Sequence, residues 1–365
     1  MNFVTFLSDM QSIHLKKDVG SIPYILNHEK NINASLLTYN LRNDVVIEAK
    51  NQYGLDLRGI NNKYGFIIDN FLYFKKNAKL IDILNLYHID KMSFYQTIFY
   101  KLFNRKGKVY IKMDCDINDF NRVYLNKYKR FLMLNTLYIL SHVISVESSK
   151  VLKYVHNCGY SKITLITNGI NVNVNQSSEN YKKENIILTV GRIGSYQKAT
   201  DILLEAAIPF LQKNPNWQVH IIGEIEENFY SVIDDFQKNN IDIKDRIVFL
   251  GEIRDQTKLM KEYSKSKVFV LPSRYESFGL VLLEALFKGC YIIMSDSIPP
   301  ATDLLINDKY GVTFKNENSM DLFNKLTIGS DDKLYENKYI KAREELIIKK
   351  FNWSIICESI LKIIK

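Results

Sequence analysis

Cysteine is scarce in this chain of 365 residues, and long apolar runs are absent. The four cysteines, Cys115, Cys158, Cys290 and Cys357, include no Cys-x-x-Cys pair, so their spacing predicts buried thiols rather than a disulfide framework. No run reaches the roughly 18 apolar residues of a membrane-spanning helix, and the nearest, residues 131–146, is interrupted by polar side chains. The first residues lack the basic stretch of a secretory signal, which predicts a cytoplasmic protein.

Proline and glycine are also few, with 6 and 15 residues, so no long disordered tract is expected. No Gly-x-Gly-x-x-Gly follows the first predicted strand, which argues against a Rossmann dehydrogenase. No recognised nucleic-acid motif is present, so nucleic acid is not expected as a partner. The composition, 46% hydrophobic and 24% charged, is globular, and the length favours two domains because single cores stop growing near roughly 250–300 residues.

The net charge of +9 is confined to the first half of the chain. Residues 1–180 contain 23 Lys and Arg against 14 Asp and Glu, whereas residues 181–365 contain 26 against 26. A basic half indicates an anionic partner, such as a phosphorylated substrate or an anionic membrane surface. The alternative is that a modest excess of charge only keeps the surface soluble.

Strands that alternate with helices are predicted along the first half. Short runs of β-type apolar residues predict strands at 2–8, 45–49, 65–69, 83–87, 108–112 and 143–146, and helical spacing predicts a helix at 93–103. Residues 168–183 are rich in Asn and Ser, have no period and interrupt this alternation. We therefore expect an N-terminal domain at 1–170 and a linker at 171–183.

The alternation restarts after this break and predicts a C-terminal domain at 184–350. Its predicted strands are 186–190, 218–222, 247–250, 268–271 and 291–294, and its helices are 199–212, 228–239, 256–264 and 280–287. The predicted fold is α/β, with two doubly wound Rossmann-like domains facing each other across a cleft. A ligand is expected in that cleft, at the carboxyl ends of the strands.

The strongest chemical signal is Pro272-Ser-Arg-Tyr-Glu276-Ser-Phe-Gly279, followed by an apolar helix that contains Glu284. A strand ends before this loop and a helix begins after it, so free backbone N–H groups there can bind a phosphate or a sugar hydroxyl. Gly279 lets a ligand approach the backbone. Glu284 lies among apolar neighbours and can accept two hydrogen bonds from a ribose diol. The alternatives are that Glu276 stabilises the helix dipole and that Glu284 is a surface charge.

The second signal is Gly191-Arg192 at a strand end, with Lys198 at the start of the next helix. The helix dipole disfavours a lysine at this position, so a bound anion would explain its presence. A pyrophosphate fits, because two cations meet two phosphates. Basic residues near strand ends are common, so this pattern alone does not specify a ligand.

Together these residues resemble glycosyltransferase family 4, whose members have the GT-B fold and transfer sugars with retention at the anomeric carbon. The resemblance covers residues 186–314 and rests on Gly191-Arg192, on Lys198 and on the Glu-x7-Glu spacing of Glu276 and Glu284. The segment 351–365 is similar to the family's last helix, which crosses back onto the N-terminal domain. The N-terminal half matches by strand pattern alone.

The resemblance implies a role for each of these residues in binding a nucleotide-sugar donor. Arg192 and Lys198 would bind the donor diphosphate and stabilise it as the leaving group, and Glu284 would hold the ribose. Glu276 would hold the donor sugar together with the backbone of Ser277, Phe278, Gly279 and Leu280. Gly191 and the stretch ending at Arg254, near the base, complete the expected donor site. Such enzymes work without a metal, because the two cations replace it electrostatically.

The N-terminal half departs from the family in two places. The first loop usually carries a Gly-Gly pair facing the diphosphate, whereas Asp18-Val-Gly20-Ser has Gly20 alone. The family often has a His after the strand matched by 108–112, where Asp114 or Lys112 would stand here, and His88 ends an earlier strand. For each of these residues a structural role is the alternative. Asp114-Cys-Asp116 also matches the Asp-x-Asp metal site of another glycosyltransferase fold, but the paired glutamates have no place there.

Basic and aromatic residues alternate along 120–140, which predicts a helix suited to an anionic membrane surface or an ordinary packed helix. A membrane would fit a lipid-linked or glycan acceptor and a peripheral position on its inner face. The function predicted is transfer of a hexose from a UDP- or GDP-sugar to such an acceptor, in surface polysaccharide or glycoconjugate synthesis. The alternatives are a catalytically silent GT-B partner of another transferase and a GT-B enzyme of different chemistry, such as a sugar-nucleotide 2-epimerase.

Overall fold

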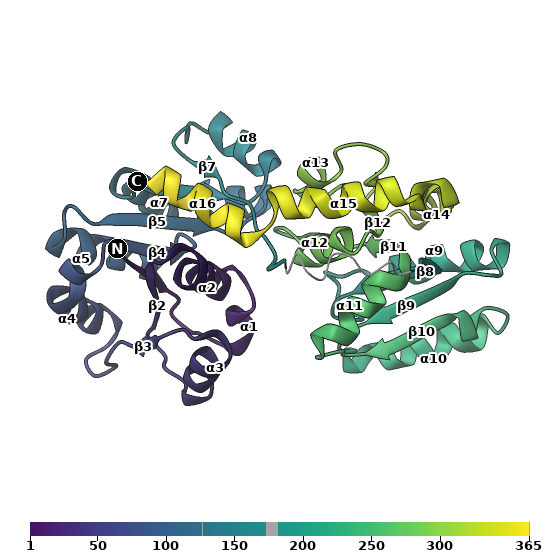
Figure 1. Ribbon diagram of the computed structural model, residues 1–365, viewed down its shortest axis with the longest axis horizontal. Helices are drawn as coiled ribbons and strands as arrows, with labels where there is room; N and C mark the ends of the chain where they lie inside the picture. Colours follow the sequence, from purple (N-terminus) through teal and green to yellow (C-terminus); the bar gives the residue numbers. More distant parts are fainter. Residues whose placement is uncertain (126, 173–181, 365) are drawn as a thin grey trace. The chain divides into compact units, whose positions relative to one another are not determined.

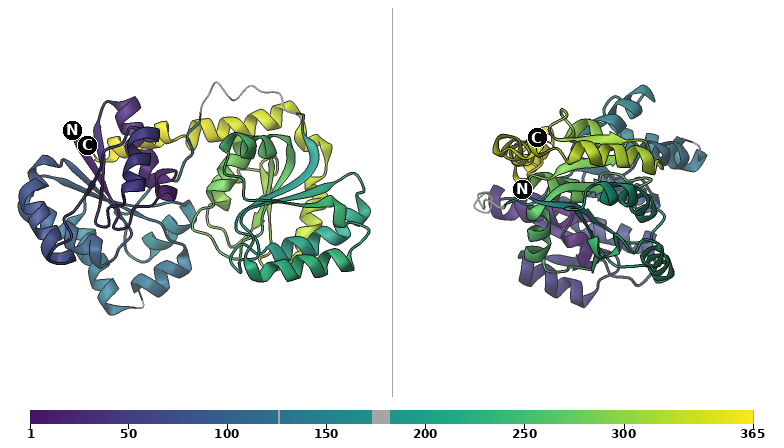
Figure 2. Two further views of the ribbon diagram at one scale, coloured as in Figure 1. Left: turned by 90° about the horizontal axis from the view of Figure 1, so that it is seen from below. Right: turned by 90° about the vertical axis from the view of Figure 1, so that its right-hand side faces the viewer.

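The computed structural model describes residues 1–125, 127–172 and 182–364, and these form two compact units. Unit 1 comprises Met1–Asn171 and Asn352–Lys365, and unit 2 comprises Val172–Phe351. Each unit is a parallel β-sheet with helices on both faces (Figures 1 and 2), which confirms the predicted doubly wound α/β class. Most of the expected linker, residues 173–181, lies outside the described residues.

Unit 1 contains a seven-stranded sheet in the order β3-β2-β1-β4-β5-β6-β7. Every neighbouring pair of strands is parallel. The strand order reverses between β1 and β4, which places the topological switch point of this sheet there. The strands are β1 Asn2–Phe6, β2 Asn33–Thr38, β3 Leu57–Gly59, β4 Ile83–Tyr87, β5 Lys108–Met113, β6 Val143–Val146 and β7 Thr164–Leu165.

The helices of unit 1 cover both faces of this sheet. They are α1 Ser12–Leu15, α2 Asp18–Lys30, α3 Asn43–Tyr53, α4 Phe66–Asn77, η1 Ala78–Leu80, α5 Lys91–Phe103, α6 Ile117–Asp119, the π-helical turn η2 Phe120–Leu125, α7 Tyr128–Leu140, α8 Ser149–Asn157 and α16 Trp353–Ile364. The predicted helix at 93–103 is confirmed as α5, and the stretch 120–140 consists of η2 and α7 instead of one helix.

Two predicted strands of unit 1 are wrong. Residues 45–49 belong to α3, whose buried residues Val45 and Ala49 are four apart and therefore share one helical face. Residues 66–69 begin α4, and Gly65 precedes it with a φ of 91°. Both errors have one cause, because a short apolar run fits a strand and a half-buried helix equally well. The strands on this side of the sheet are instead β2 and, at the edge, β3.

The last helix, α16, belongs to unit 1 although it follows the whole of unit 2 in the chain. Its residues Trp353, Ile356 and Ile360 are buried in one cluster with Ile22 and Leu26 of α2. The Trp353 N–H donates to the carbonyl of Ile170 at 3.2 Å, which joins the start of α16 to the end of the first segment. Figure 1 shows α16, in yellow, beside α2, against which it packs.

Unit 2 contains a six-stranded parallel sheet in the order β10-β9-β8-β11-β12-β13, with its switch point between β8 and β11. Every strand and helix predicted for this half is confirmed. The strands are β8 Glu184–Val190, β9 Gln218–Ile222, β10 Ile247–Gly251, β11 Ser266–Leu271, β12 Tyr291–Ser295 and β13 Gly311–Phe314. The helices are α9 Thr200–Lys213, η4 Glu227–Phe229, α10 Tyr230–Asn239, η5 Lys244–Arg246, α11 Gln256–Lys265, α12 Leu280–Phe287, α13 Ala301–Leu304, α14 Ser319–Gly329, η6 Asp332–Tyr335 and α15 Asn337–Lys350.

Two cations, the partly buried Lys183 and the fully buried Arg343, hold the carboxyl end of α12 in place. Lys183 donates to the carbonyls of Tyr263, Ser266 and Lys288 at 2.6–3.2 Å. Arg343 of α15 is fully buried and donates to the carbonyl of Gly289 at 2.9 Å. These carbonyls close α11 and α12, where a positive charge complements the helix dipole.

Three of the four cysteines, Cys115, Cys290 and Cys357, are buried free thiols, as predicted. Among the described residues, no helix is both long enough and apolar enough to cross a membrane.

Candidate functional site

The two sequence signals of unit 2 meet at its switch point. Gly191 and Arg192 follow β8 directly, and the loop 272–279 follows β11, its neighbour in the sheet. Because both strands run in the same direction, their carboxyl ends lie at the same edge of the sheet. Open parallel sheets bind ligands at this edge, beside the point where the strand order reverses.

Lys198 and Glu276 form an ion pair between the Lys198 Nζ and the Glu276 Oε1 atoms. The Ser273 hydroxyl donates to the same oxygen at 3.1 Å. Glu276 is 9% exposed, while the Lys198 side chain is 22% exposed and can still reach a ligand. A carboxylate this buried requires a partner, and Lys198 supplies it.

Gly191 makes room for the lysine. A Cβ atom at Gly191 would lie 3.3 Å from the Cδ of Lys198, so the aliphatic stem of the lysine packs along the glycine backbone. Ala199, the next residue, adopts the left-handed conformation with a φ of 52° and is fully buried. Such a conformation favours glycine, and it turns the chain from the Lys198 loop into α9.

The N-terminus of α12 offers the backbone donors that the sequence predicts. Gly279 occupies the N-cap position of the helix with a φ of 83°. Because glycine has no side chain, it cannot cap the first amides of the helix. The N–H groups of residues 277–280 have no hydrogen-bond acceptor among the described residues. Phe278 is buried and anchors this turn, so Ser277, Gly279 and Leu280 present their amides beside a carboxylate and an ammonium group.

Glu284 lies on α12 and accepts a hydrogen bond from the Tyr263 hydroxyl at 2.9 Å. Tyr263 is fully buried on α11. Burial raises the pKa of Glu284, although the hydrogen bonds from Tyr263 and Gln256 oppose this effect. The surface-charge alternative for Glu284 is therefore wrong, because the carboxylate is held in place by a buried partner.

Arg192 and Arg254 are not brought into contact with Lys198. Arg192 is exposed and has no side-chain partner among the described residues. It lines a small hollow of about 10 Å³ together with Gly191, Lys198 and Leu271. Arg254 follows β10 at the edge of the sheet, where it pairs with Glu252 at 2.7 Å and is 85% exposed. Arg192 thus borders the site, whereas Arg254 lies on the surface.

In unit 1, the predicted loop at Asp18–Ser21 is wrong, because these residues form the first turn of α2. Gly20 is buried there, and a Cβ atom on it would lie 2.2 Å from the carbonyl oxygen of Leu15. A close approach of two backbones therefore explains this glycine. His88 directly follows β4 with a φ of 60°, is exposed, and lines a cavity of about 60 Å³ with Tyr87 and Gln96.

Lys112 is fully buried and faces the interior of unit 1. Its ammonium group pairs with Glu147, lies 2.9 Å from Asp18 and donates to Asn168 at 2.6 Å. Burial alone would lower the pKa of Lys112, but the two carboxylates outweigh burial and raise it. Burial acts in the opposite direction on Glu147 and raises the pKa of its carboxyl group, while the Lys112 ammonium group opposes this effect. Lys112 therefore fixes the first turn of α2 to β5 and β6 and does not face a ligand.

Asp114 is exposed just beyond the end of β5, two residues after Lys112. Asp116, the other carboxylate of the Asp-x-Asp match, accepts from the Asp119 N–H at 2.7 Å and caps α6. Among the described residues, no three His, Cys, Asp or Glu side chains are grouped so as to hold a metal ion. The structure gives the Asp-x-Asp match a capping role.

Residues 173–346 match the family described as Glycosyl transferases group 1. The matched segment, somewhat less than half of the chain, is a group 1 glycosyltransferase domain. An uncharacterized glycosyltransferase of Methanocaldococcus jannaschii, MJ1607, is 27% identical over 296 residues, which are 77% of this chain and 71% of that protein. The lipopolysaccharide core biosynthesis mannosyltransferase LpcC of Rhizobium leguminosarum is 31% identical over 109 residues. That match spans 29% of this chain and 30% of the relative, less than two thirds of its length.

Solved structures show the same fold. A glycosyltransferase from Rickettsia africae has a TM-score of 0.77 at 16% identity, with 100% of this chain and 97% of that chain covered. HepE of Anabaena, in complex with UDP and glucose, has a TM-score of 0.73 at 14% identity, covering 99% and 98%. The fold is therefore the GT-B fold that the glycosyltransferase resemblance implied.

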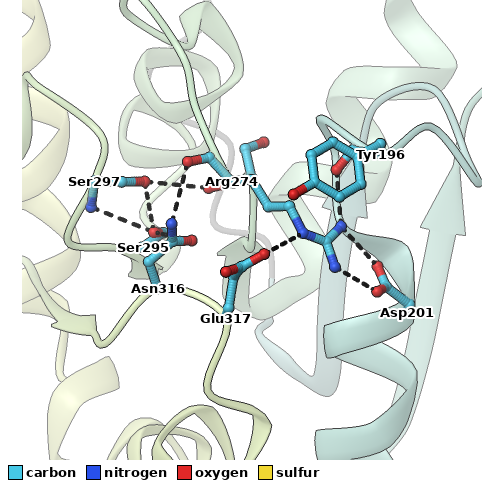
Figure 3. Close-up of polar contacts among 8 residues, drawn as sticks. Tyr196, Asp201, Arg274, Ser295, Ser297, Asn316 and Glu317 are labelled. Atoms are coloured by element: carbon cyan, nitrogen blue, oxygen red, sulfur yellow. Dashed lines mark hydrogen bonds and ion pairs between the residues drawn. The ribbon is translucent and has the colours of Figure 1, made fainter. Parts of the chain in front are cut away.

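Two residues that support the site were not identified from the sequence, one outside the family's motif and one within it. Tyr263 lies outside the motif, and no pattern in α11 distinguishes it from a core tyrosine. Arg274 stands inside the motif, between Ser273 and Glu276, and its side chain reaches two neighbouring loops (Figure 3). An arginine two residues before a buried glutamate was the available signal.

Proposed function

We propose that this glycosyltransferase moves a hexose with retention from a UDP- or GDP-linked donor to a glycan or lipid-linked acceptor. The observation that carries the proposal is the Lys198–Glu276 pair beside the open N-terminus of α12, at the switch point of unit 2. An ammonium group, a carboxylate and free backbone amides at one sheet edge suit a sugar attached to a diphosphate.

In this proposal Lys198 and Arg192 neutralise the charge that develops on the departing diphosphate. Glu276 keeps the Lys198 ammonium oriented before the donor arrives, since the two side chains are already paired. Preorganised charges of this kind need no rearrangement at the moment of reaction, which is why they lower the barrier. The two cations supply the positive charge that a divalent metal supplies in other transferases.

The same proposal assigns the rest of the donor to α12 and its loop. The amides of residues 277–280 and the Glu276 carboxylate bind sugar hydroxyls, and Glu284 accepts hydrogen bonds from the ribose. Tyr263 already uses one Glu284 oxygen and thereby fixes the direction of the other. In unit 1, Asp114 is the exposed member of the pair Lys112 and Asp114, and we assign the contact with the donor sugar to it.

Retention needs no protein nucleophile in this scheme. The acceptor hydroxyl attacks the anomeric carbon from the face that the diphosphate leaves, and a donor phosphate oxygen takes the hydroxyl proton. The site residues then act by binding, orientation and charge, which are the contributions expected from preorganised groups.

Surface polysaccharide or glycoconjugate synthesis is the process we propose for this activity. HepE, which shares the fold, was solved with UDP and glucose, and LpcC acts in lipopolysaccharide core synthesis. The basic first half of the chain suits a peripheral position at the cytoplasmic face of a membrane. On α7 and the turn before it, Arg122 and Tyr128 are 75–76% exposed, and Ile139 is 76% exposed.

A thermal-shift screen tests the donor proposal. UDP, GDP, ADP, CMP and several UDP- and GDP-sugars are added to the protein, with and without EDTA. A ligand at 100 times its dissociation constant stabilises the folded state by about 2.7 kcal/mol, which raises the melting temperature measurably. We expect a shift with one nucleoside diphosphate, unchanged by EDTA and lost in Glu284→Ala. No shift with any of these ligands would contradict the proposal.

A further inference from the structure

Arg274 makes a denser set of contacts than any other arginine near the donor site. Its guanidinium group forms a two-pronged ion pair with Asp201, at 2.6 and 3.2 Å, and donates to the Tyr196 carbonyl at 2.8 Å. Its Nε donates to Glu317 at 2.9 Å, and the group lies 4.3 Å from the centre of the Tyr196 ring. Figure 3 shows the guanidinium between these three side chains.

These contacts join the loop after β8 to the loop after β11. Asp201 lies in the first turn of α9, three residues after Lys198, and Tyr196 lies two residues before Lys198. Two further hydrogen bonds link these loops. The Arg274 backbone N–H donates to the Gln197 carbonyl at 2.9 Å, and the Gln197 side-chain Nε2 donates to the Tyr275 carbonyl at 3.2 Å. The loops that carry Lys198 and Glu276 are therefore fastened on both sides of those residues.

A third loop, after β13, is tied to the same arginine. Glu317 adopts a left-handed backbone conformation with a φ of 60°, which is unfavourable for a glutamate, and its carboxylate reaches Arg274. Asn316 donates to the Arg274 carbonyl at 3.3 Å, and Ser295 at the end of β12 donates to Asn316 at 3.1 Å. Three loops at one edge of the sheet thus converge on Arg274 (Figure 3).

The residue type matters for this arrangement. The Arg274 side chain is 13% exposed, while its partners Asp201 and Glu317 are 48% and 56% exposed. A guanidinium group presents a rigid planar fork that can serve two carboxylates and a carbonyl together, whereas an ammonium group is a point charge. A lysine at position 274 would keep the positive charge but could not donate to both carboxylates and the carbonyl at once.

We infer that Arg274 is a positioning residue, which holds the Lys198 loop at the distance from Glu276 that the diphosphate requires. Arg274 contacts neither the Lys198 nor the Glu276 side chain, so it acts through the loops that carry them. This inference rests on the proposed function, because it assigns Lys198 to the leaving group. A displacement of about 1 Å in a catalytic group is enough to cost roughly a hundredfold in rate.

The first experiment measures backbone hydrogen exchange in the ligand-free protein. The Lys198 and Ala199 amides both donate to the Ser195 carbonyl, at 3.1 and 3.2 Å, and report on this loop. We expect Arg274→Ala to accelerate their exchange at least tenfold and Arg274→Lys to accelerate it less. The matched control is Arg246→Ala, since Arg246 also fastens α9 by donating to the Leu211 carbonyl, at the helix's other end. Unchanged exchange in the Arg274 variants would overturn the inference.

The second experiment is kinetic and uses the donor that the wild type turns over. We expect Arg274→Ala to lower kcat about 10- to 100-fold with a smaller change in KM, and Arg246→Ala to leave both unchanged. In a Lys198→Ala background the further loss should be under threefold, because residues that act through each other are not additive. Asp201→Asn removes one partner and gives a milder test if Arg274→Ala folds poorly.

The two proposals fail in different ways. If no donor binds or is turned over by the wild type, the proposed function fails, and the exchange data still decide whether Arg274 fixes the loop. If the wild type is active and Arg274→Ala keeps its kcat, or if the losses in the double variant simply add, the positioning role is wrong.

Discussion

Lys198 depends on its immediate neighbours for its orientation. Gly191 leaves space for its stem, Ala199 turns the chain behind it, and Glu276 pairs with its ammonium group. The ion pair also explains why Glu276 tolerates its burial. Placing charged groups beside apolar strands is unfavourable, and each of these local contacts offsets part of that free-energy cost.

Replacement of Lys198 by Ala should lower kcat about 100- to 1000-fold, because a lost charge contact in the transition state costs about 2.7–4 kcal/mol. KM for the donor should change less. Steady-state kinetics with the donor found by the nucleotide screen measure both constants. The control is Lys265→Ala, which breaks a partly buried ion pair with Glu262 on α11. A Lys198→Ala enzyme with the wild-type kcat would contradict the assignment.

Replacement of Glu284 by Gln should weaken nucleotide binding roughly 10- to 100-fold, since hydrogen bonds to charged groups contribute about 1.5–3 kcal/mol. The raised pKa of Glu284 means that ionisation in its partly buried position destabilises the fold as the pH rises through that pKa. The Gln variant removes this charge, so its melting temperature without ligand should stay the same or rise. Calorimetric titration with the nucleotide and thermal melting measure the two effects.

The same raised pKa gives a pH test. As the pH falls toward the usual pKa of a glutamate, Glu284 takes up a proton earlier than an ordinary glutamate, because its pKa is raised, and it loses its ability to accept from the ribose. Wild-type affinity for the nucleotide should therefore fall more steeply than that of Glu284→Gln. The exposed Glu205→Gln on α9 is the control and should follow the wild type. Parallel pH profiles in all three proteins would refute the ribose contact.

Helices and strands set where these residues stand. The apolar runs in the sequence predicted β8 and β11 as strands. Because these strands pair in parallel, the loops that follow them lie next to each other. In unit 1 the same reasoning failed for α3 and α4, because half-buried helices with few buried residues present short apolar runs. The first turn of α2 also looked like a loop, because Gly20 disfavours helix and its packing partner lies in α1.

Gly20→Ala should destabilise the protein by about 2–3 kcal/mol. The new methyl group would lie 2.2 Å from the Leu15 carbonyl oxygen, and backbone atoms can move aside only by shifting α1 against α2. Urea unfolding measures the change in free energy. Gly59→Ala is the control, since its methyl group would meet the exposed and flexible side chain of Leu41 at 3.0 Å and should cost under about 1 kcal/mol. Equal losses in both variants would show that the contact with Leu15 is unimportant.

At the scale of the whole molecule, the basic charge is concentrated in one of the two units, since residues 1–180 carry the entire excess. If this charge serves a membrane surface, the protein should float with anionic vesicles at low salt and dissociate as salt screens the attraction. Neutral vesicles should not bind it. Absence of binding to anionic vesicles at low salt would contradict the membrane proposal.

Charge reversal locates the binding face. Arg122→Glu with Lys129→Glu should weaken vesicle binding about tenfold or more, because each basic residue near the surface contributes about 1 kcal/mol. Lys258→Glu with Lys261→Glu, two exposed lysines of α11 in unit 2, is the matched control and should keep wild-type binding. Flotation at a series of lipid concentrations measures the difference.

The sequence alone determined the α/β class, the position of every predicted element in the second half, and the motif shared with the glycosyltransferase family. These follow from local patterns, since apolar periodicity and the residues at strand ends act within a few positions along the chain. Only the tertiary structure decided which residues meet. It paired Lys198 with Glu276 and Glu284 with Tyr263, buried Lys112 between two carboxylates, and brought Arg274 to Asp201 and Glu317. Partners separated by 21 to 94 positions are joined by strand order and loop packing, which no local pattern encodes.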